Sequence, residues 1–409
     1  MAALARTGPL LQVSKKLPVL GLTRQNCKQS VCNRILYLPV RSTSLKKSLW
    51  MCCSAKNTEW QSCTLWHNQC CTHVAKQALS TMTMSERPYI LSSKLSDTEG
   101  IQREHAEIIK KHFNIIWFDE FLKNKEELAN KIQVVFLWGH SLKVDQKLLQ
   151  SLPRLKAVVS SGVGVDHLHL PLISSFGVKV TNTPHLVDNA TADMGMALML
   201  ASARNVIEGF KIATSPETQC MPWNWVGVEV TGATLGIIGM GRIGYKVAQR
   251  AKGFDMKILY HNRNRRTEEE ERVVDASYCA KIDDLLWQSD FVMVVVNLTP
   301  QTLKLIGERE LSLMKPTGTL VNISRGAVVD QDALVKALQN GTIRAAALDV
   351  TDPEPLPRDH PLLKLSNAII TPHLGTATDK TTEKMLERMI ENAMAAVCGL
   401  PLPDEVLIS

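Results

Sequence analysis

Short apolar runs alternate with longer stretches of helical pattern along the chain from residue 89 onward. The first group of runs predicts five strands, at 89–91, 115–118, 134–138, 156–160 and 178–181. The stretches between them, such as 98–112 and 125–131, are typical of helices. Strands that alternate with helices form parallel sheets covered on both faces, so this part of the chain predicts a small doubly wound α/β domain.

A long apolar helix is expected at 189–204, and the alternation then resumes with a second group of runs. This group predicts six strands, at 233–238, 257–261, 291–296, 318–323, 345–350 and 368–370. A final helix at 379–398 is expected to return to the first domain. The predicted fold class is therefore α/β, with two doubly wound domains.

Three glycines, Gly239, Gly241 and Gly244, follow the first strand of the second group in a G-x-G-x-x-G spacing. Gly239 allows a tight turn, Gly241 lets a ligand approach the backbone, and Gly244 lets the helix at 242–252 pack on the strand. An ordinary glycine-rich turn is the alternative interpretation. The strand before and the helix after favour a dinucleotide pyrophosphate at the helix N-terminus, and hence a Rossmann dinucleotide-binding domain.

Positive charge follows the strand at 257–261, in the segment Asn262-Arg263-Asn264-Arg265-Arg266. An NAD site usually has an acid about 20 residues after the glycines to bind the ribose hydroxyls, and no acid occurs here. A guanidinium can instead bind a 2′-phosphate by a bidentate contact. We therefore expect NADPH/NADP as the cofactor and NADH as a weaker alternative, with Arg263 as the leading contact and Arg265 or Arg266 as a secondary one. An exposed basic loop is the competing interpretation, and the glutamates at 268–271 predict a solvated helix start.

Arg325, Glu354 and His373 follow three successive strands of the second group. Ligands of doubly wound sheets bind at the carboxyl ends of strands. An arginine can hold the carboxylate of a 2-oxo acid and polarise its carbonyl, a histidine can donate the proton, and a glutamate can orient the imidazole. A surface arginine, a loop glutamate and a core or capping histidine are the individual alternatives. Together, beside the glycines, the three residues predict a reductive catalytic site.

The first 83 residues differ from the remainder in composition. They hold eleven Lys or Arg, one acid (Glu59) and seven of the ten cysteines, so the net charge of +7 comes from this extension. We interpret it as a mitochondrial transit peptide or a disordered tail outside the fold. The rest of the chain is net negative and has no long apolar run, so we expect no nucleic-acid partner and no membrane span. The cysteine spacing does not favour a metal site.

The motifs Ser161-Gly-Val-Gly-Val-Asp-His, Gly239-Met-Gly-Arg-Ile-Gly, Asn322-Ile-Ser-Arg-Gly and Pro372-His-Leu-Gly resemble those of the D-isomer-specific 2-hydroxyacid dehydrogenase family. The resemblance covers about residue 86 to the end and is strongest to the glyoxylate/hydroxypyruvate reductase branch. It implies a discontinuous flavodoxin-like substrate domain at 84–187 and 374–409, and a Rossmann domain at 188–373. It also implies a homodimer built on the Rossmann domains, and a cytoplasmic location unless the extension is a transit peptide.

The resemblance implies further roles for individual residues. The backbone around Ser161, Gly162 and Val163 is expected to hold the substrate carboxylate. The residues expected to contact the cofactor are Gly239, Gly241, Arg242, Ile243, Gly244, Thr191, Asn262 and Asp349. In the glyoxylate/hydroxypyruvate branch a tryptophan before the dinucleotide domain is expected to reach the partner's active site. Trp223 and Trp225 lie near that position but out of register, so packing is the alternative for both.

The expected activity is NADPH-dependent reduction of glyoxylate or hydroxypyruvate to glycolate or D-glycerate. Another small 2-oxo-acid reductase, such as one of the 2-ketogluconate type, is the nearest alternative. A dinucleotide-sensing module of the corepressor kind is the alternative from a different class, and the missing acid after the strand at 257–261 argues against it.

Overall fold

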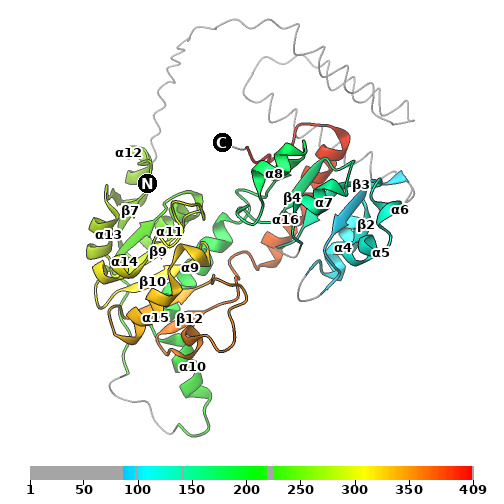
Figure 1. Ribbon diagram of the computed structural model, residues 1–409. Helices are drawn as coiled ribbons and strands as arrows, with labels where there is room; N and C mark the ends of the chain where they lie inside the picture. The colour runs from blue at the N-terminus through cyan, green and yellow to red at the C-terminus, as the bar shows by residue number, and fades with distance from the viewer. Residues whose placement is uncertain (1–85, 97–99, 140–141, 219–224, 408–409) are drawn as a thin grey trace, which may run out of the picture. The chain divides into compact units, whose positions relative to one another are not determined.

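The structure is a computed structural model, and it contains two parallel sheets with helices between their strands (Figure 1). The described residues are 86–96, 100–139, 142–218 and 225–407. The extension at 1–83 and Trp223 lie outside them, so what is inferred for both stays a prediction. No helix in the described ranges is long and apolar enough to cross a lipid bilayer.

The first sheet has five strands in the order β2-β1-β3-β4-β5, and each neighbouring pair is parallel. The strands are β1 Tyr89–Ser92, β2 Asn114–Trp117, β3 Ile132–Leu137, β4 Ala157–Ser160 and β5 Lys179–Thr181. The helices between them are α4 Arg103–Lys110, α5 Phe118–Lys123, α6 Lys125–Leu128, α7 Gln146–Gln150 and α8 Leu170–Ser175. Every residue of β4 is buried, because a continuous apolar strand can be covered by helices on both faces.

The second sheet has seven strands in the order β12-β11-β10-β9-β6-β7-β8, and it too is parallel throughout. The strands are β6 Thr234–Ile238, β7 Lys257–His261, β8 Ala276–Tyr278, β9 Phe291–Val294, β10 Thr319–Asn322, β11 Ala345–Leu348 and β12 Ala368–Ile370. The helices packed around it include α11 Arg242–Lys252, α12 Glu268–Val274, α13 Ile282–Gln288, α14 Glu308–Leu313 and α15 Gln331–Gln339. The strand order reverses between β6 and β9, which is where doubly wound sheets bind dinucleotides.

The fold class expected from the sequence is confirmed, and one strand count is corrected. The sequence predicts six strands in the second sheet, whereas the described sheet has seven. The additional strand, β8, has three residues, and none of them is buried. A short, half-exposed edge strand has no apolar run, and its pairing with β7 is visible only in the folded chain.

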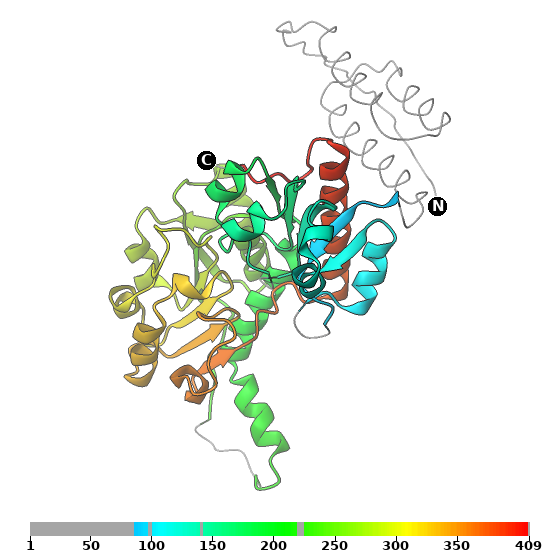
Figure 2. The ribbon, with the colours of Figure 1, turned by 45° about the vertical axis from the view of Figure 1, so that its right-hand side comes forward.

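Two long helices connect the regions of the two sheets. α9 Asp188–Ala203 packs Met196 and Met199 into the core of the seven-stranded sheet. α16 Asp379–Cys398 packs Leu386 and Met389 into the core of the five-stranded sheet. Figure 2 shows α16 in red beside the cyan strands of that sheet. The C-terminal segment of the chain thus returns to the first sheet, as the helical pattern at 379–398 predicts.

A further helix, α10 Val206–Thr214, follows α9 and extends away from the seven-stranded sheet (Figure 2). The chain turns at Asn205, which adopts a left-handed conformation with φ 51°. No residue of α10 is buried in the described chain. Val206, Ile207 and Phe210 are exposed, and the Phe210 side chain is the most open of the three at 67%. Exposed apolar side chains grouped on one helix are typical of a protein interface.

Candidate active site

In the glycine loop between β6 and α11, two glycines are closely packed and the third has open space around it. Gly239 has φ 96°, and a Cβ there would lie 2.5 Å from the carbonyl oxygen of Val295. A Cβ on Gly244 would lie 2.5 Å from the carbonyl oxygen of Gly239. A Cβ on Gly241, by contrast, would meet no atom within 4 Å among the described residues. The loop therefore fits a dinucleotide pyrophosphate, since its backbone is open at Gly241, the N-cap of α11, and closely packed on either side.

The three arginines after β7 have different partners. Arg265 makes a bidentate ion pair with Glu271, with both N···O distances at 2.8 Å. Arg266 donates to the carbonyl oxygens of Met240 and Gly241 in the glycine loop. Arg263 is exposed and makes no ion pair or hydrogen bond through its side chain among the described residues. Arg263 is therefore the arginine of this segment that is available to a bound phosphate.

One expectation about the glutamates at 268–271 is corrected by the structure. They do begin a helix, α12, and Thr267 and Glu270 form its capping box. The start of α12 is not wholly solvated, however, because Glu271 is only 7% exposed and accepts hydrogen bonds from Arg265 and Tyr260. The sequence motif shows the helix start but not which glutamate faces inward.

Two of the other expected cofactor contacts, Asn262 and Arg242, adjoin the glycine loop. Asn262 donates through Nδ2 to the carbonyl oxygen of Met240 at 3.1 Å. Arg242 is the first residue of α11 and lies 3.5 Å from a carboxylate oxygen of Asp188. Ile243 packs against the core of the seven-stranded sheet. Thr191 is buried in the first turns of α9, next to Gly375.

Arg325, Glu354 and His373 emerge beyond the carboxyl ends of β10, β11 and β12, which are neighbours in the sheet. The structure brings two of them into direct contact: Nδ1 of His373 lies 2.9 Å from Oε2 of Glu354. The other oxygen of Glu354 accepts a hydrogen bond from the amide of Thr351 at 3.0 Å. The imidazole is thus held through Nδ1, and its Nε2 has no hydrogen-bond partner among the described residues.

Asp349 fixes the loop that carries His373. Its carboxylate accepts hydrogen bonds from the hydroxyl of Thr371 at 2.7 Å, the amide of Leu374 at 2.7 Å and the amide of Gly375 at 2.8 Å. Its backbone carbonyl accepts from the amide of His373, which itself has φ 57°. Asp349 is only 2% exposed, so its described contacts organise the loop from the buried side.

Glu354 is a carboxylate at neutral pH, and its pKa is lowered. Burial acts to raise the pKa of its carboxyl group. The hydrogen bond to His373 and the charge of that imidazole outweigh burial, with smaller contributions from the Thr351 amide and Arg325, and the pKa lies below its usual value. A negative charge is therefore maintained at Nδ1 of His373.

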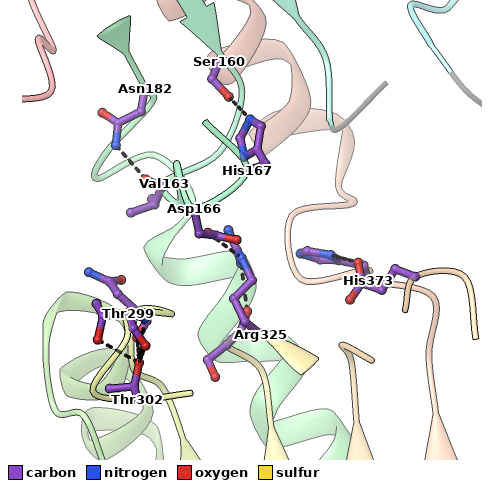
Figure 3. Close-up of polar contacts among 12 residues, drawn as sticks. Ser160, Val163, Asp166, His167, Asn182, Thr299, Thr302, Arg325 and His373 are labelled. Carbon is purple, nitrogen blue, oxygen red and sulfur yellow. Dashed lines mark hydrogen bonds and ion pairs between the residues drawn. The ribbon is translucent and has the colours of Figure 1, made fainter. Parts of the chain in front are cut away.

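Arg325 is held in place from two directions. Its Nε donates to Oδ1 of Asp166 at 3.0 Å, and its Nη1 donates to the carbonyl oxygen of Ser324 at 2.8 Å. Figure 3 shows the Arg325 side chain reaching from its strand end toward Asp166. A Cβ on Gly164 would overlap Nη2 of Arg325, so a glycine is needed where the guanidinium lies on the loop. Nη2 remains as the nitrogen without an acceptor among the described residues.

The loop at Ser161, Gly162 and Val163 follows β4. The Ser161 amide donates to the carbonyl oxygen of Leu137, so it is already used within the sheet. Thr183 donates to the carbonyl oxygen of Gly162, and Asn182 donates to that of Val163 at 2.7 Å. The amides of Gly162 and Val163 have no acceptor among the described residues. These two amides, rather than that of Ser161, are the free donors of the loop.

Several residues near the site were not assigned a role from the sequence. Asp166 and Gly164 lie inside the quoted 161–167 motif, but their contact with Arg325 joins segments 159 residues apart. Thr299 and Thr302 follow β9, the strand next to β10, and hydrogen-bond to each other (Figure 3). A polar Thr-Pro-Gln-Thr segment a few residues beyond a buried strand is the sequence signal that could have identified this loop.

Trp225 packs against the projecting helix rather than near the catalytic residues of its own chain. Its ring lies over Gly209 of α10, where a Cβ would come within 2.9 Å of it. Its Nε1 donates to Glu208 at 3.4 Å. This position fits the packing interpretation, and its relation to a partner's active site stays a prediction.

A doubly wound sheet with a glycine loop at its switch point and a paired histidine and glutamate at neighbouring strand ends defines a dinucleotide-dependent oxidoreductase. Residues 196–375 match the family model described as D-isomer specific 2-hydroxyacid dehydrogenase, NAD binding domain. The chain belongs to the D-isomer-specific 2-hydroxyacid dehydrogenase family.

Proteins named as glyoxylate or glyoxylate/hydroxypyruvate reductases match most of the chain. Glyoxylate reductase of Thermococcus onnurineus is 40% identical over 313 residues, which cover 75% of this chain and 93% of the relative. Glyoxylate/hydroxypyruvate reductase B of Pectobacterium atrosepticum is 42% identical over 294 residues, covering 71% of this chain and 90% of the relative. The fold matches as well. The crystal structure of an NADPH-dependent glyoxylate/hydroxypyruvate reductase from Sinorhizobium meliloti, in complex with NADP and malonate, has a TM-score of 0.69 and 27% identity, covering 78% of this chain and 97% of that one.

Proposed function

We propose that the protein reduces glyoxylate or hydroxypyruvate to glycolate or D-glycerate, with NADPH as the cofactor. The observation that carries this proposal is the hydrogen-bonded pair of His373 and Glu354, at strand ends next to the one that carries Arg325. Relatives named for glyoxylate and hydroxypyruvate reduction support the choice of substrate.

His373 is the proposed proton donor. Glu354 holds Nδ1 at 2.9 Å, so Nε2 is the nitrogen that can donate to the carbonyl oxygen of the substrate. Glu354 also fixes the orientation of the ring through this contact. When bound, the dinucleotide supplies the hydride that reduces the carbonyl carbon.

Arg325 is proposed to bind and polarise the substrate. Because Nε is paired with Asp166 and Nη1 with Ser324, its Nη2 is the donor left for the substrate carbonyl and carboxylate oxygens. The free amides of Gly162 and Val163 would hold the carboxylate from the other side, with Ser161 positioning them. A small 2-oxo acid carries its carbonyl and carboxylate oxygens on adjacent carbons. Donors from two loops, Nη2 of Arg325 and the amides of Gly162 and Val163, can therefore bind both groups.

The preference for NADPH rests on the segment after β7. Arg263 is exposed and without an ion-pair partner among the described residues, and the segment has no acid to repel a 2′-phosphate. The NADP complex of the Sinorhizobium meliloti relative supports a phosphorylated cofactor. Gly239, Gly241, Arg242, Ile243 and Gly244 are the proposed pyrophosphate site, and Asn262 the neighbour of the adenosine ribose. Thr191 and Asp349 are proposed to lie by the nicotinamide.

We also propose the homodimer and the domain boundaries that the family resemblance implies. The exposed apolar face of α10 supports association with a second copy. The packing of α16 on the five-stranded sheet supports a discontinuous substrate domain at 84–187 and 374–409, with the Rossmann domain at 188–373.

The test is a comparison of kcat/KM for glyoxylate, hydroxypyruvate, pyruvate and 2-ketogluconate, each with NADPH and with NADH. We expect the first two substrates and NADPH to be preferred. Arg263→Met should lower kcat/KM with NADPH by about 10- to 100-fold, the size of one or two lost charge-assisted hydrogen bonds, and leave NADH unaffected. Equal use of both cofactors would contradict the role of Arg263. Preference for 2-ketogluconate would overturn the substrate, and NADPH binding without any reduction would indicate a sensing module.

A further inference from the structure

The segment that joins β7 to α12 carries three arginines, and one of them points back to the glycine loop. Nε of Arg266 donates to the carbonyl oxygen of Met240 at 2.7 Å, and Nη2 donates to that of Gly241 at 2.8 Å. The guanidinium also lies 4.7 Å from the ring centre of Tyr245, in the first turn of α11, and its side chain is only 18% exposed. These contacts connect the segment near the expected adenosine ribose with the loop expected at the pyrophosphate.

Nη1 of Arg266 also pairs with Glu270 at 2.6 Å, but the segment has further anchors that do not involve the Arg266 side chain. Tyr260 is fully buried, and its hydroxyl donates to Glu271 and accepts from the backbone amide of Arg266. Burial and the hydrogen bond to Glu271 raise the pKa of Tyr260 to about 12. The Arg265 hydrogen bond outweighs burial and lowers the pKa of Glu271 to about 2, so Tyr260 stays neutral and Glu271 stays charged. Removing the Arg266 side chain therefore leaves these anchors of the segment in place.

The effect of Arg266 on a ligand follows from the planarity of the peptide bond. The carbonyl of Gly241 and the amide of Arg242 belong to one trans peptide, so they point in opposite directions. Arg242 is the first residue of α11, and its amide is one of the N–H groups that a helix N-terminus offers to an anion. The Gly241 carbonyl already accepts from the Tyr245 amide at 3.0 Å, so a cation bonded to the same oxygen adds to the hold on that peptide and polarises its N–H group.

We propose that Arg266 is a positioning residue for the cofactor pyrophosphate, acting through the carbonyls of Met240 and Gly241 and not through the 2′-phosphate. This inference rests on the proposed dinucleotide site and deepens it, because it assigns different parts of the cofactor to two arginines of one segment. Arg263 binds the 2′-phosphate. Arg266 orients the loop that binds the pyrophosphate, which NADPH and NADH share. Loss of Arg266 should therefore weaken NADPH and NADH equally.

Calorimetric titration of the full-length protein with two partial ligands tests this assignment. ADP-ribose contains the pyrophosphate but no 2′-phosphate, and adenosine 2′-monophosphate contains the 2′-phosphate but no pyrophosphate. Arg266→Met should raise the Kd of ADP-ribose about tenfold, the loss of roughly one hydrogen bond to a charged group, and change that of adenosine 2′-monophosphate little. Arg263→Met should show the opposite pattern. Arg309→Met is the matched control, since Arg309 pairs with Asp283 and Glu310 instead.

The outcomes separate this inference from the proposed function. An unchanged ADP-ribose Kd in Arg266→Met, or weakening confined to adenosine 2′-monophosphate, would overturn the role of Arg266. Equal weakening of both ligands would overturn it too, because it would show general damage to the site. No effect of Arg263→Met on adenosine 2′-monophosphate would contradict the NADPH preference alone. If Arg266→Met does not fold, Arg266→Lys decides: it keeps the charge but lacks the planar fork, so an intermediate loss for ADP-ribose is expected and no loss would overturn the proposal.

Discussion

At the scale of single residues, the chemistry depends on which atoms of Arg325, Glu354 and His373 are already occupied. Glu354 occupies Nδ1 of His373, and Asp166 occupies Nε of Arg325. The two side chains are thus held in place, and Nε2 of the imidazole and Nη2 of the guanidinium have no partner within the described part of the chain. Preset donors lower the cost of reorganisation when the substrate binds.

The pair of His373 and Glu354 makes a prediction about pH. The Glu354 carboxylate holds Nδ1 of His373 only while it is ionised, so turnover should fall as the pH drops and Glu354 takes up a proton. Glu354→Gln has no carboxyl group to titrate, so this acid limb should be missing from its kcat profile, and its kcat should be about 10- to 100-fold lower because Nδ1 of His373 loses its charged partner. The wild-type carboxylate has a lowered pKa, so its own contribution is lost only in acid, below the usual glutamate range.

The measurement is the pH dependence of kcat for glyoxylate with saturating NADPH. Glu269→Gln is the control, because Glu269 is an exposed glutamate far from His373. It lies on α12, which follows β7, and β7 is near the opposite edge of the sheet from β12. An acid limb that persists in Glu354→Gln would show that it does not arise from this carboxylate.

The positions of the site residues can be predicted from the sequence, but not all of their partners can. The sequence predicts that Arg325, Glu354 and His373 lie at one sheet edge, because the carboxyl ends of parallel strands share that edge. It does not predict that Asp166 holds Arg325, since nothing in either local pattern points to a residue 159 positions away. It does not separate the roles of Arg263, Arg265 and Arg266 either. That separation depends on which way α12 folds back and presents Glu271.

At the scale of elements, the glycine loop between β6 and α11 combines tight packing with an open approach. Its expected strand, turn and helix are all present, and the bounds of α11 agree with the sequence interpretation. Strong apolar periodicity predicts such elements well, as it does for α16. β8 and α10 were missed because neither presents the usual pattern: β8 has no buried residue, and α10 leaves apolar residues exposed.

Two alanine substitutions separate the roles of the glycines. Gly241→Ala should leave the free energy of unfolding within about 0.5 kcal/mol of the wild type, because its Cβ meets no atom within 4 Å in the described chain. Its methyl group would occupy the open approach, so the Kd of NADPH should rise at least about tenfold. Gly239→Ala should cost about 1–3 kcal/mol or more, because φ is 96° and the Cβ lies 2.5 Å from the Val295 carbonyl oxygen.

Urea unfolding and calorimetric titration of both variants check these outcomes. Normal NADPH affinity in Gly241→Ala would show that the cofactor does not approach the loop there. Normal stability in Gly239→Ala would show that the turn does not need the left-handed conformation.

At the scale of the whole molecule, the described chain has two sheets with separate cores, connected by α9 and α16. The alternation of strands and helices predicts both sheets, and the apolar patterns at 189–204 and 379–398 predict the two connecting helices. The oligomeric state is a different matter. An apolar patch predicts association only when the fold leaves it exposed, as it leaves Val206, Ile207 and Phe210 of α10 among the described residues.

Phe210→Asp tests the proposed homodimer. The substitution places a charge on the exposed apolar face of α10, so we expect the variant to sediment as a monomer while the wild type sediments as a dimer. Trp287→Asp on α13 is the control, since Trp287 is also an exposed large apolar residue but lies outside α10. A wild-type monomer, or a Phe210→Asp variant that remains dimeric, would exclude α10 as the dimer contact.

The central claim is that His373 protonates a 2-oxo acid as NADPH reduces it. The most direct test is kcat for glyoxylate with saturating NADPH in the wild type and in His373→Gln, with the Kd of NADPH measured alongside. Loss of a general acid predicts a fall in kcat of about 10²- to 10⁴-fold with nearly unchanged NADPH affinity. Turnover by His373→Gln close to that of the wild type would contradict the account.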